Sequence, residues 1–188
     1  MKFSAIKIAK MGILIALAIG LNLVLFEIPN VELISFVVFS SGYLLGITEG
    51  GIVGLLAMFI YSVFNPMGMP TLPVLVTQVI SMTLIGISGG LVGKIKWFAQ
   101  GKIVNFLIIG AIGFFLTLIY DFLTNLVWGY TSGQILPVLI GGTLLSLVHT
   151  ISNAVIFTVL APVTYKVKRL EVKQDHSQNR TMERGNCL

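Results

Sequence analysis

The feature that most constrains this chain is a series of apolar runs, each about 15 to 25 residues long, that recur along nearly its whole length. A helix needs about 20 apolar residues to cross a bilayer core about 30 Å thick. Hydrophobic residues make up 56% and charged residues only 10% of the 188-residue chain, which is too apolar for a single water-soluble core. The sequence therefore predicts an integral membrane protein that is nearly all membrane domain.

Turn and charge signals separate the apolar runs. One break, from Asn65 to Pro73, holds three prolines, and another lies between Thr48 and Gly51. Because every break is short, neighbouring helices are expected to be antiparallel. The prediction is an all-α, compact bundle of about six transmembrane helices. The expected spans are 8–26, 33–48, 50–64, 72–93, 103–128 and 135–165.

The charged residues predict how the chain is oriented. All 12 lysines and arginines lie near the ends of the chain or in the one predicted loop from Lys94 to Lys102, and these positions share one side if the N-terminus is cytoplasmic. Their places at helix ends indicate contacts with lipid headgroups rather than nucleic acid, despite the net charge of +5. Residues 1–169 are expected to form the transmembrane domain. The polar residues 170–188 are expected to be a disordered cytoplasmic tail.

A stripe of small residues marks the first predicted helix. Gly12, Ala16 and Gly20 recur every four residues, which lets another helix backbone approach closely. We interpret the stripe as a docking surface for a partner protein. The alternative is ordinary packing against helices of the same chain.

The helix predicted over 103–128 carries polar residues on one face. Helical spacing places Thr117, Asp121, Asn125 and Trp128 on that face. A carboxylate inside a bilayer costs at least about 2.5 kcal/mol, so Asp121 is expected to face a cavity or a partner group. The alternative is a structural hydrogen bond between helices.

Other polar residues are expected to complete a substrate site with Asp121 and Asn125. His149 and Asn153 lie one turn apart on the last helix, where they could face Asp121, or could instead be satisfied by packing neighbours. Tyr120 and Trp128 offer stacking surfaces for a heteroaromatic ring. The remaining predicted members are Gln78 on the fourth helix, and Glu32 and Asn65 in outer loops that could also be plain solvated connectors.

Charge narrows the expected ligand. The predicted outer half holds Glu27, Glu32 and Asp121 but no lysine or arginine to pair with a carboxylate or phosphate. A neutral or cationic small molecule is therefore favoured. The sequence contains no nucleotide-binding or metal-ligand motif, and its single cysteine, Cys187, cannot form a disulfide within one chain, so no metal or cofactor is predicted.

In these respects the chain resembles the substrate-binding S components of energy-coupling factor vitamin transporters. The resemblance covers roughly residues 5 to 165 and rests on the small-residue stripe, on six helices in fewer than 200 residues, and on the two polar pairs of the last helices. It implies a non-enzymatic subunit of an ABC-type importer in a bacterial or archaeal plasma membrane. Such a subunit captures a vitamin or related micronutrient and docks through its first helix on a transmembrane coupling protein with two cytosolic ATPases.

Two other classes of function stay open on the sequence alone. A membrane-embedded enzyme could use Asp121 and His149, acting on lipid or, with Ser88, as a rhomboid-like protease. Such an enzyme would turn over its substrate, whereas a capture subunit releases its ligand intact. A self-sufficient channel or secondary transporter would have no need of the docking stripe.

Overall fold

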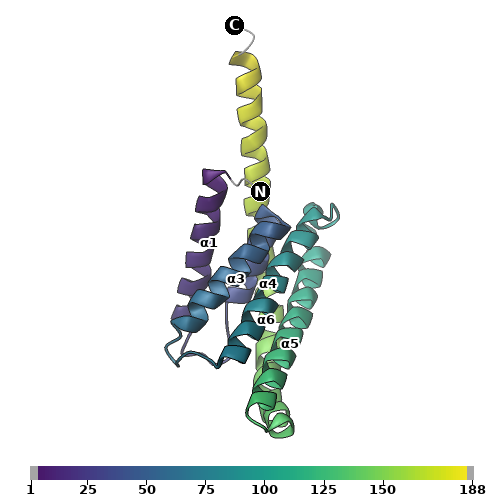
Figure 1. Cartoon of the computed structure of the whole chain (residues 1–188). Helices are drawn as coiled ribbons and strands as arrows, with labels where there is room; N and C mark the ends of the chain where they lie inside the picture. Colours follow the sequence, from purple (N-terminus) through teal and green to yellow (C-terminus); the bar gives the residue numbers. More distant parts are fainter. Residues whose placement is uncertain (1–3, 186–188) are drawn as a thin grey trace.

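The fold is entirely α-helical in the part of the chain that the structure describes. The computed structural model describes residues 4–185, with side chains described as far as Lys173. Over this range the all-α prediction is confirmed, and one short 3-10 turn, Phe98–Gln100, is added. The helices (Figure 1) are α1 (Ala5–Val24), α2 (Ile34–Leu45), α3 (Ile47–Val63), α4 (Leu72–Lys94), α5 (Ile103–Thr131) and α6 (Ile135–Gly185).

Length and composition identify four of the described helices as able to cross a membrane: α1, α4, α5 and the Ile135–Lys173 part of α6. This confirms the prediction of a multi-pass membrane protein. The other two helices are apolar but shorter, with 12 residues in α2 and 17 in α3. Six complete crossings therefore stay a prediction.

The break between α2 and α3 is sharper than predicted. It consists of Gly46 alone, whose φ of 124° is a conformation that glycine adopts freely and other residues rarely do. The prediction of a break from Thr48 to Gly51 was wrong, because those residues form the first turns of α3. Gly46 thus turns the chain back on itself without a loop.

The core of the bundle is α2 and its neighbours. Every residue from Ile34 to Tyr43 is buried, and α2 packs against α1, α3, α4 and α6. Glycines on α4 allow this closeness, since a Cβ on Gly86 would collide with the backbone of Gly50, and one on Gly89 with the carbonyl of Phe39. The glycines of α4 therefore serve close helix packing.

A second close pair is formed by α5 and α6, which run antiparallel beside each other. A Cβ on Gly110 would meet the side chain of Thr158, and one on Gly113 the ring of Phe157. Beyond the bundle, α6 continues as helix to Gly185 (yellow in Figure 1). It passes through the predicted domain boundary at residue 170 without a break, so the division into domain and tail stays a prediction.

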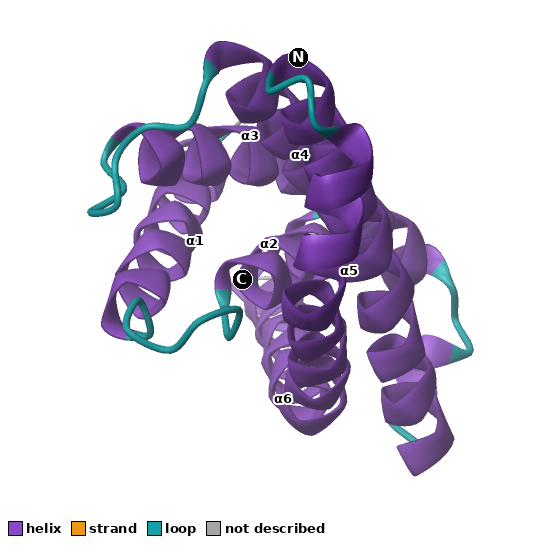
Figure 2. Ribbon diagram, turned by 90° about the horizontal axis from the view of Figure 1, so that it is seen from below, coloured by secondary structure: helices purple, strands orange, loops and turns teal. Residues whose placement is uncertain are grey.

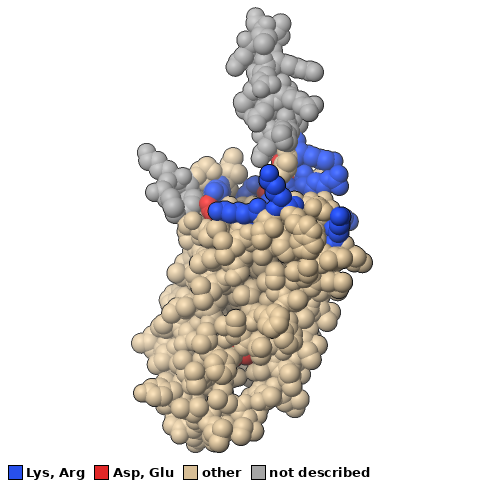
Figure 3. Space-filling model, turned by 90° about the vertical axis from the view of Figure 1, so that its right-hand side faces the viewer, with Lys and Arg blue, Asp and Glu red and all other residues tan. Residues whose placement is uncertain are grey.

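The positive charge gathers at one end of the described molecule, as Figure 3 shows for one face. This end contains the start of α1, the end of α4, the start of α5 and the later turns of α6. Lys7 pairs with Glu49, and Lys10 Nζ lies 2.6 Å from Glu171 Oε1, so two ion pairs join α1 to α3 and to α6. Which side of the membrane this end faces stays a prediction.

A half-buried lysine joins three helices near the same end. Lys168 Nζ on α6 donates to the carbonyl of Tyr43 (2.5 Å) and to the carbonyl of Gly93 (3.1 Å). Both carbonyls lie in the last turn of their helices, α2 and α4, where a cation is favoured by the helix dipole. Lys168 therefore caps two helices at once.

Candidate ligand-binding cavity

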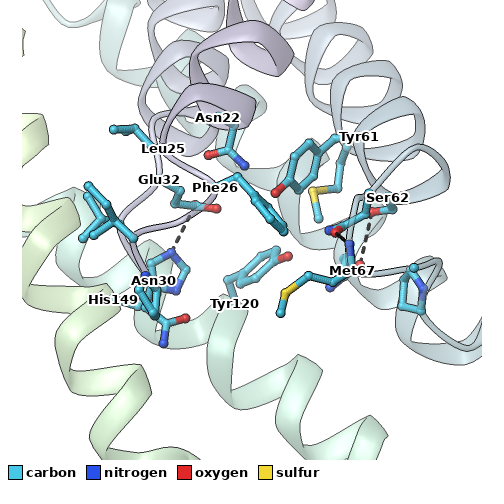
Figure 4. A pocket seen from close by; sticks show the side chains of 18 residues that line it. Asn22, Leu25, Phe26, Asn30, Glu32, Tyr61, Ser62, Met67, Tyr120 and His149 are labelled. Atoms are coloured by element: carbon cyan, nitrogen blue, oxygen red, sulfur yellow. Dashed lines mark hydrogen bonds and ion pairs between the residues drawn. The ribbon is translucent and has the colours of Figure 1, made fainter.

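A cavity of about 370 Å³ lies at the end of the bundle away from the lysines. Its walls come from the end of α1, the loop before α2, the end of α3, the loop before α4, and single residues of α4, α5 and α6 (Figure 4). This volume is within the range of small-molecule sites. The lining residues are Asn22, Leu25, Phe26, Ile28, Pro29, Asn30, Val31, Glu32, Met58, Tyr61, Ser62, Asn65, Met67, Gly68, Pro70, Gln78, Tyr120 and His149.

Several residues that the sequence suggested separately meet at this cavity. Glu32, Asn65, Gln78, Tyr120 and His149 all line it, although they come from two loops and three helices. Two of them form hydrogen bonds with other lining residues. Gln78 accepts a hydrogen bond from Ser62 (3.2 Å), and Asn65 accepts one from the backbone N–H of Met67 (2.9 Å). The polar groups of the cavity are therefore fixed partly by one another.

The imidazole of His149 lies between two carboxylates. Its Nδ1 is 2.8 Å from Asp121 Oδ1, and its Nε2 is at ion-pair distance, 3.1 Å, from Glu32 Oε1 (Figure 4). His149 and Asp121 are buried, and Ser35 also donates to Glu32 Oε1. Glu32 faces the cavity, His149 lies at its wall, and Asp121 lies behind His149.

The surroundings of Glu32 keep it ionised. Burial raises the pKa of this carboxyl, but the charge of His149 and hydrogen bonds from His149, Ser35 and Asn153 outweigh burial. The pKa of Glu32 therefore lies below the usual value of a glutamate. A negative group is thus maintained at the cavity wall.

Three residues on α5 and α6 that the sequence predicted for the substrate site do not line the main cavity. Asn125 donates to Ser146 Oγ (3.2 Å) and lines a different cavity of about 180 Å³ between α5 and α6, which Asp121 also lines. Asn153 is fully buried and donates to Thr117 (3.0 Å). Trp128 is 55% exposed on the outside of α5 and lines neither cavity.

The polar face of α5 is therefore turned mainly toward α6. Helical spacing correctly grouped its polar residues, but they form a ladder between two helices rather than the wall of the main cavity. Two of its pairs reach Glu32 at the cavity wall, one through His149 and one through Asn153. The three rungs are Thr117 with Asn153, Asp121 with His149, and Asn125 with Ser146.

Sequence reasoning missed the contributions of α1 and α3 to the cavity. Asn22 on α1 and Met58 and Tyr61 on α3 line it, as does Phe26 in the loop after α1, and Asn22 also accepts a hydrogen bond from the backbone of Leu33 (3.3 Å). One signal was available, because Asn22 is the only amide in the first apolar run. Its burial in an apolar helix marks it as a residue with a polar partner.

The small-residue stripe of α1 faces outward. Gly12, Ala16 and Gly20 are exposed, and a Cβ built on either glycine would meet nothing within 4 Å. Figure 2 shows α1 at the side of the bundle, beside α3 and apart from α5. The stripe therefore takes no part in packing within the described chain.

Ser88 and His149 are not brought together. Ser88 Oγ donates to the backbone carbonyl of Leu84 (2.8 Å), while both ring nitrogens of His149 face carboxylates. The serine–histidine pair of a rhomboid-like protease is thus not formed here. Nor is any group of three or more histidine, cysteine, aspartate or glutamate residues found that could hold a metal ion, over the residues that the structure describes.

Comparison with known proteins identified no relative of this chain. No protein-family model, no curated protein and no solved structure matches it.

Proposed function

We propose that this chain is the substrate-capture subunit, or S component, of an energy-coupling factor type ABC importer for a vitamin or related micronutrient. The observation that carries the proposal is the cavity of about 370 Å³, lined by amides, hydroxyls and one carboxylate inside an otherwise apolar bundle. Polar groups placed among apolar walls are typical of small-molecule sites. The chain binds its ligand there without changing it.

The proposed orientation follows from the charges. Lysines and arginines are retained on the cytoplasmic side of membrane proteins, so the basic end of the bundle lies inside the cell and the cavity opens outside. In this arrangement six helices lie in a bacterial or archaeal plasma membrane, with the N-terminus in the cytoplasm. The cavity is then placed to take its ligand from the medium.

The proposed partner is a transmembrane coupling protein with two cytosolic ATPases, which docks on α1. The exposed stripe of Gly12, Ala16 and Gly20 supports this, because small residues that contact nothing in their own chain leave room for the backbone of another helix. The stripe lies outside the cavity, so docking and ligand capture use separate surfaces.

The test of the proposal combines binding with uptake. Mass spectrometry of small molecules that copurify with the protein identifies the ligand, and uptake of that ligand is then measured in cells with the coupling module. Ala16→Trp is expected to keep the ligand but to reduce uptake at least tenfold, since the indole blocks close approach of a partner helix. Leu144→Trp is the control, because Leu144 is exposed on α6 and away from the stripe.

The alternatives predict other results. Normal uptake by Ala16→Trp would refute docking through α1 and favour a self-sufficient transporter. Conversion of a copurified molecule or lipid by the isolated protein would favour a membrane-embedded enzyme.

A further inference from the structure

The cluster beside the cavity contains two carboxyl groups and one imidazole. Glu32 and Asp121 contribute two carboxylates, and His149 between them contributes at most one positive charge. With both acids ionised, the cluster is therefore negative whether or not the imidazole is protonated. Because charge buried away from water is costly unless it is compensated, a positive group in the cavity would be stabilised.

The described part of the chain does not supply that positive group. No lysine or arginine is among the residues that line the cavity. Figure 3 places the visible lysines and arginines of the described chain at the opposite end of the bundle. The amides of Asn22, Asn65 and Gln78 line the cavity but carry no charge.

Aromatic rings surround the same space. Phe26 from the loop before α2, Tyr61 from α3 and Tyr120 from α5 all line the cavity, and Figure 4 shows their side chains converging on it beside Glu32. The face of an aromatic ring attracts a cation, and several rings around one site are a common way to hold an organic ammonium group. The rings also provide apolar surface for the rest of such a ligand.

We infer that the cavity binds an organic cation, whose positive charge lies between the Glu32 carboxylate and the rings of Phe26, Tyr61 and Tyr120. This inference rests on the proposed function in one respect, namely that the cavity is the site of capture. It adds the chemical class of the ligand, since neutral and anionic molecules leave the charge of the cluster uncompensated.

The experiment uses three probes with the same ring and different charges: 1-methylnicotinamide (cationic), nicotinamide (neutral) and nicotinate (anionic). Binding to the full chain in nanodiscs is measured by ligand-observed NMR at neutral pH, after removal of copurified molecules. We expect 1-methylnicotinamide to bind at least tenfold more tightly than nicotinamide, and nicotinate to bind more weakly than either. Equal affinity for the cation and the neutral probe, or no binding of any probe at 10 mM, would overturn the inference.

Two variants test whether Glu32 causes the preference for the cationic probe. Glu32→Gln is expected to abolish the preference for the cation, whereas Glu27→Gln is expected to keep it, because Glu27 is exposed in the same loop and does not line the cavity. Should Glu32→Gln fail to fold, Phe26→Leu replaces it and is expected to weaken binding of the cation at least threefold more than that of nicotinamide. An unchanged preference in the folded variant contradicts the inference.

The outcomes separate this inference from the proposed function. Cation binding without uptake of any ligand would refute the proposed importer function but would agree with the proposed cation site. Ligand-dependent uptake that requires Ala16, but of a neutral or anionic molecule, would support the importer and refute the cation site.

Discussion

His149 is the residue through which the cavity and the helix pair α5–α6 are connected. Each ring nitrogen lies within 3.1 Å of a carboxylate oxygen, from Asp121 on one side and Glu32 on the other. An imidazole with a proton on both nitrogens can donate to both acids at once. Asp121 therefore orients the ring, and the ring in turn orients Glu32 toward the cavity.

Replacing Asp121 is expected to affect ligand binding although Asp121 lies behind the cavity wall. Asp121→Asn removes the carboxyl group that contacts His149 Nδ1, and we expect ligand affinity to fall about 10- to 150-fold, in line with about 1.5–3 kcal/mol for a hydrogen bond to a charged group. Titration calorimetry with the copurified ligand measures the change. Asn125→Ala is the matched control, since Asn125 faces Ser146 in another cavity, and its affinity should be unchanged.

The depressed pKa of Glu32 predicts a dependence of stability on pH. Since its pKa is lower in the folded chain than in the unfolded one, ionised Glu32 stabilises the fold above about pH 4.3, the ordinary value for glutamate, and this contribution is lost as the pH falls through the folded pKa. The melting temperature of the parent in detergent should therefore fall more steeply below about pH 4.3 than that of Glu32→Gln. If the melting temperatures of the parent and of Glu32→Gln fall equally on acidification, ionised Glu32 does not stabilise the fold. Glu27→Gln is the control, and its melting temperature should change with pH as that of the parent does.

For single residues, the sequence correctly predicted which ones share a helix face. It did not predict what that face contacts. The spacing of Asp121 and Asn125 correctly placed them on one side of α5, because helical periodicity is a local property. Whether that side faces a cavity or a neighbouring helix depends on the rotation of α5 about its axis. The rotation is set by packing around Gly110 and Gly113, which contact residues more than 40 positions away.

Among the elements, α2 is held in the centre of the bundle by glycines on its neighbours. Gly86 and Gly89 of α4 face backbone atoms of α3 and α2, with no space for a methyl group. Such contacts are strong in membranes, where association depends on close packing rather than on the hydrophobic effect.

Adding a single methyl group at this crossing is expected to separate the helices. Gly89→Ala should lower the unfolding free energy by about 1–3 kcal/mol, the usual cost of overpacking, and Gly86→Ala by a similar amount. Unfolding by SDS in mixed micelles, followed by circular dichroism, measures the change. Gly141→Ala is the control, because nothing lies within 4 Å of a Cβ there, and its stability should be unchanged or slightly raised.

The helices themselves were predictable because each is an apolar run bounded by turn residues. The predicted spans 72–93 and 103–128 differ from α4 and α5 by only a few residues. The boundary that was wrong lies where composition and conformation disagree: Gly46 breaks the chain inside an apolar stretch.

At the scale of the whole molecule, the separation of charge predicts its orientation. With the basic end in the cytoplasm, Glu27 in the loop before α2 lies outside the cell and Lys96 after α4 lies inside. In a Cys187→Ser background, Glu27→Cys should react with a membrane-impermeant maleimide in intact cells, and Lys96→Cys only after permeabilisation. The reverse labelling pattern would place the cavity in the cytoplasm and contradict the proposed direction of uptake.

The sequence predicted a helical membrane protein with a site near the outer loops, but not the contribution of α1 and α3 to the cavity. The cavity is formed where α1 and α3 end and their loops return, and it brings together residues as distant as Asn22 and His149. Such contacts depend on the relative positions of five helices. No local pattern of residues determines those positions.

The unequal lengths of the helices have a consequence for the surrounding lipid. At about 1.5 Å per residue, the 17 residues of α3 extend about 26 Å, whereas the 29 residues of α5 extend about 44 Å. Both helices expose large apolar side chains, such as Phe59 on α3 and Phe115 on α5. In the proposed arrangement both helices cross a hydrocarbon layer about 30 Å thick, which matches neither length. Hydrophobic mismatch would then act in opposite senses on the two sides of the molecule, thinning the bilayer beside α3 and tilting α5 away from the membrane normal.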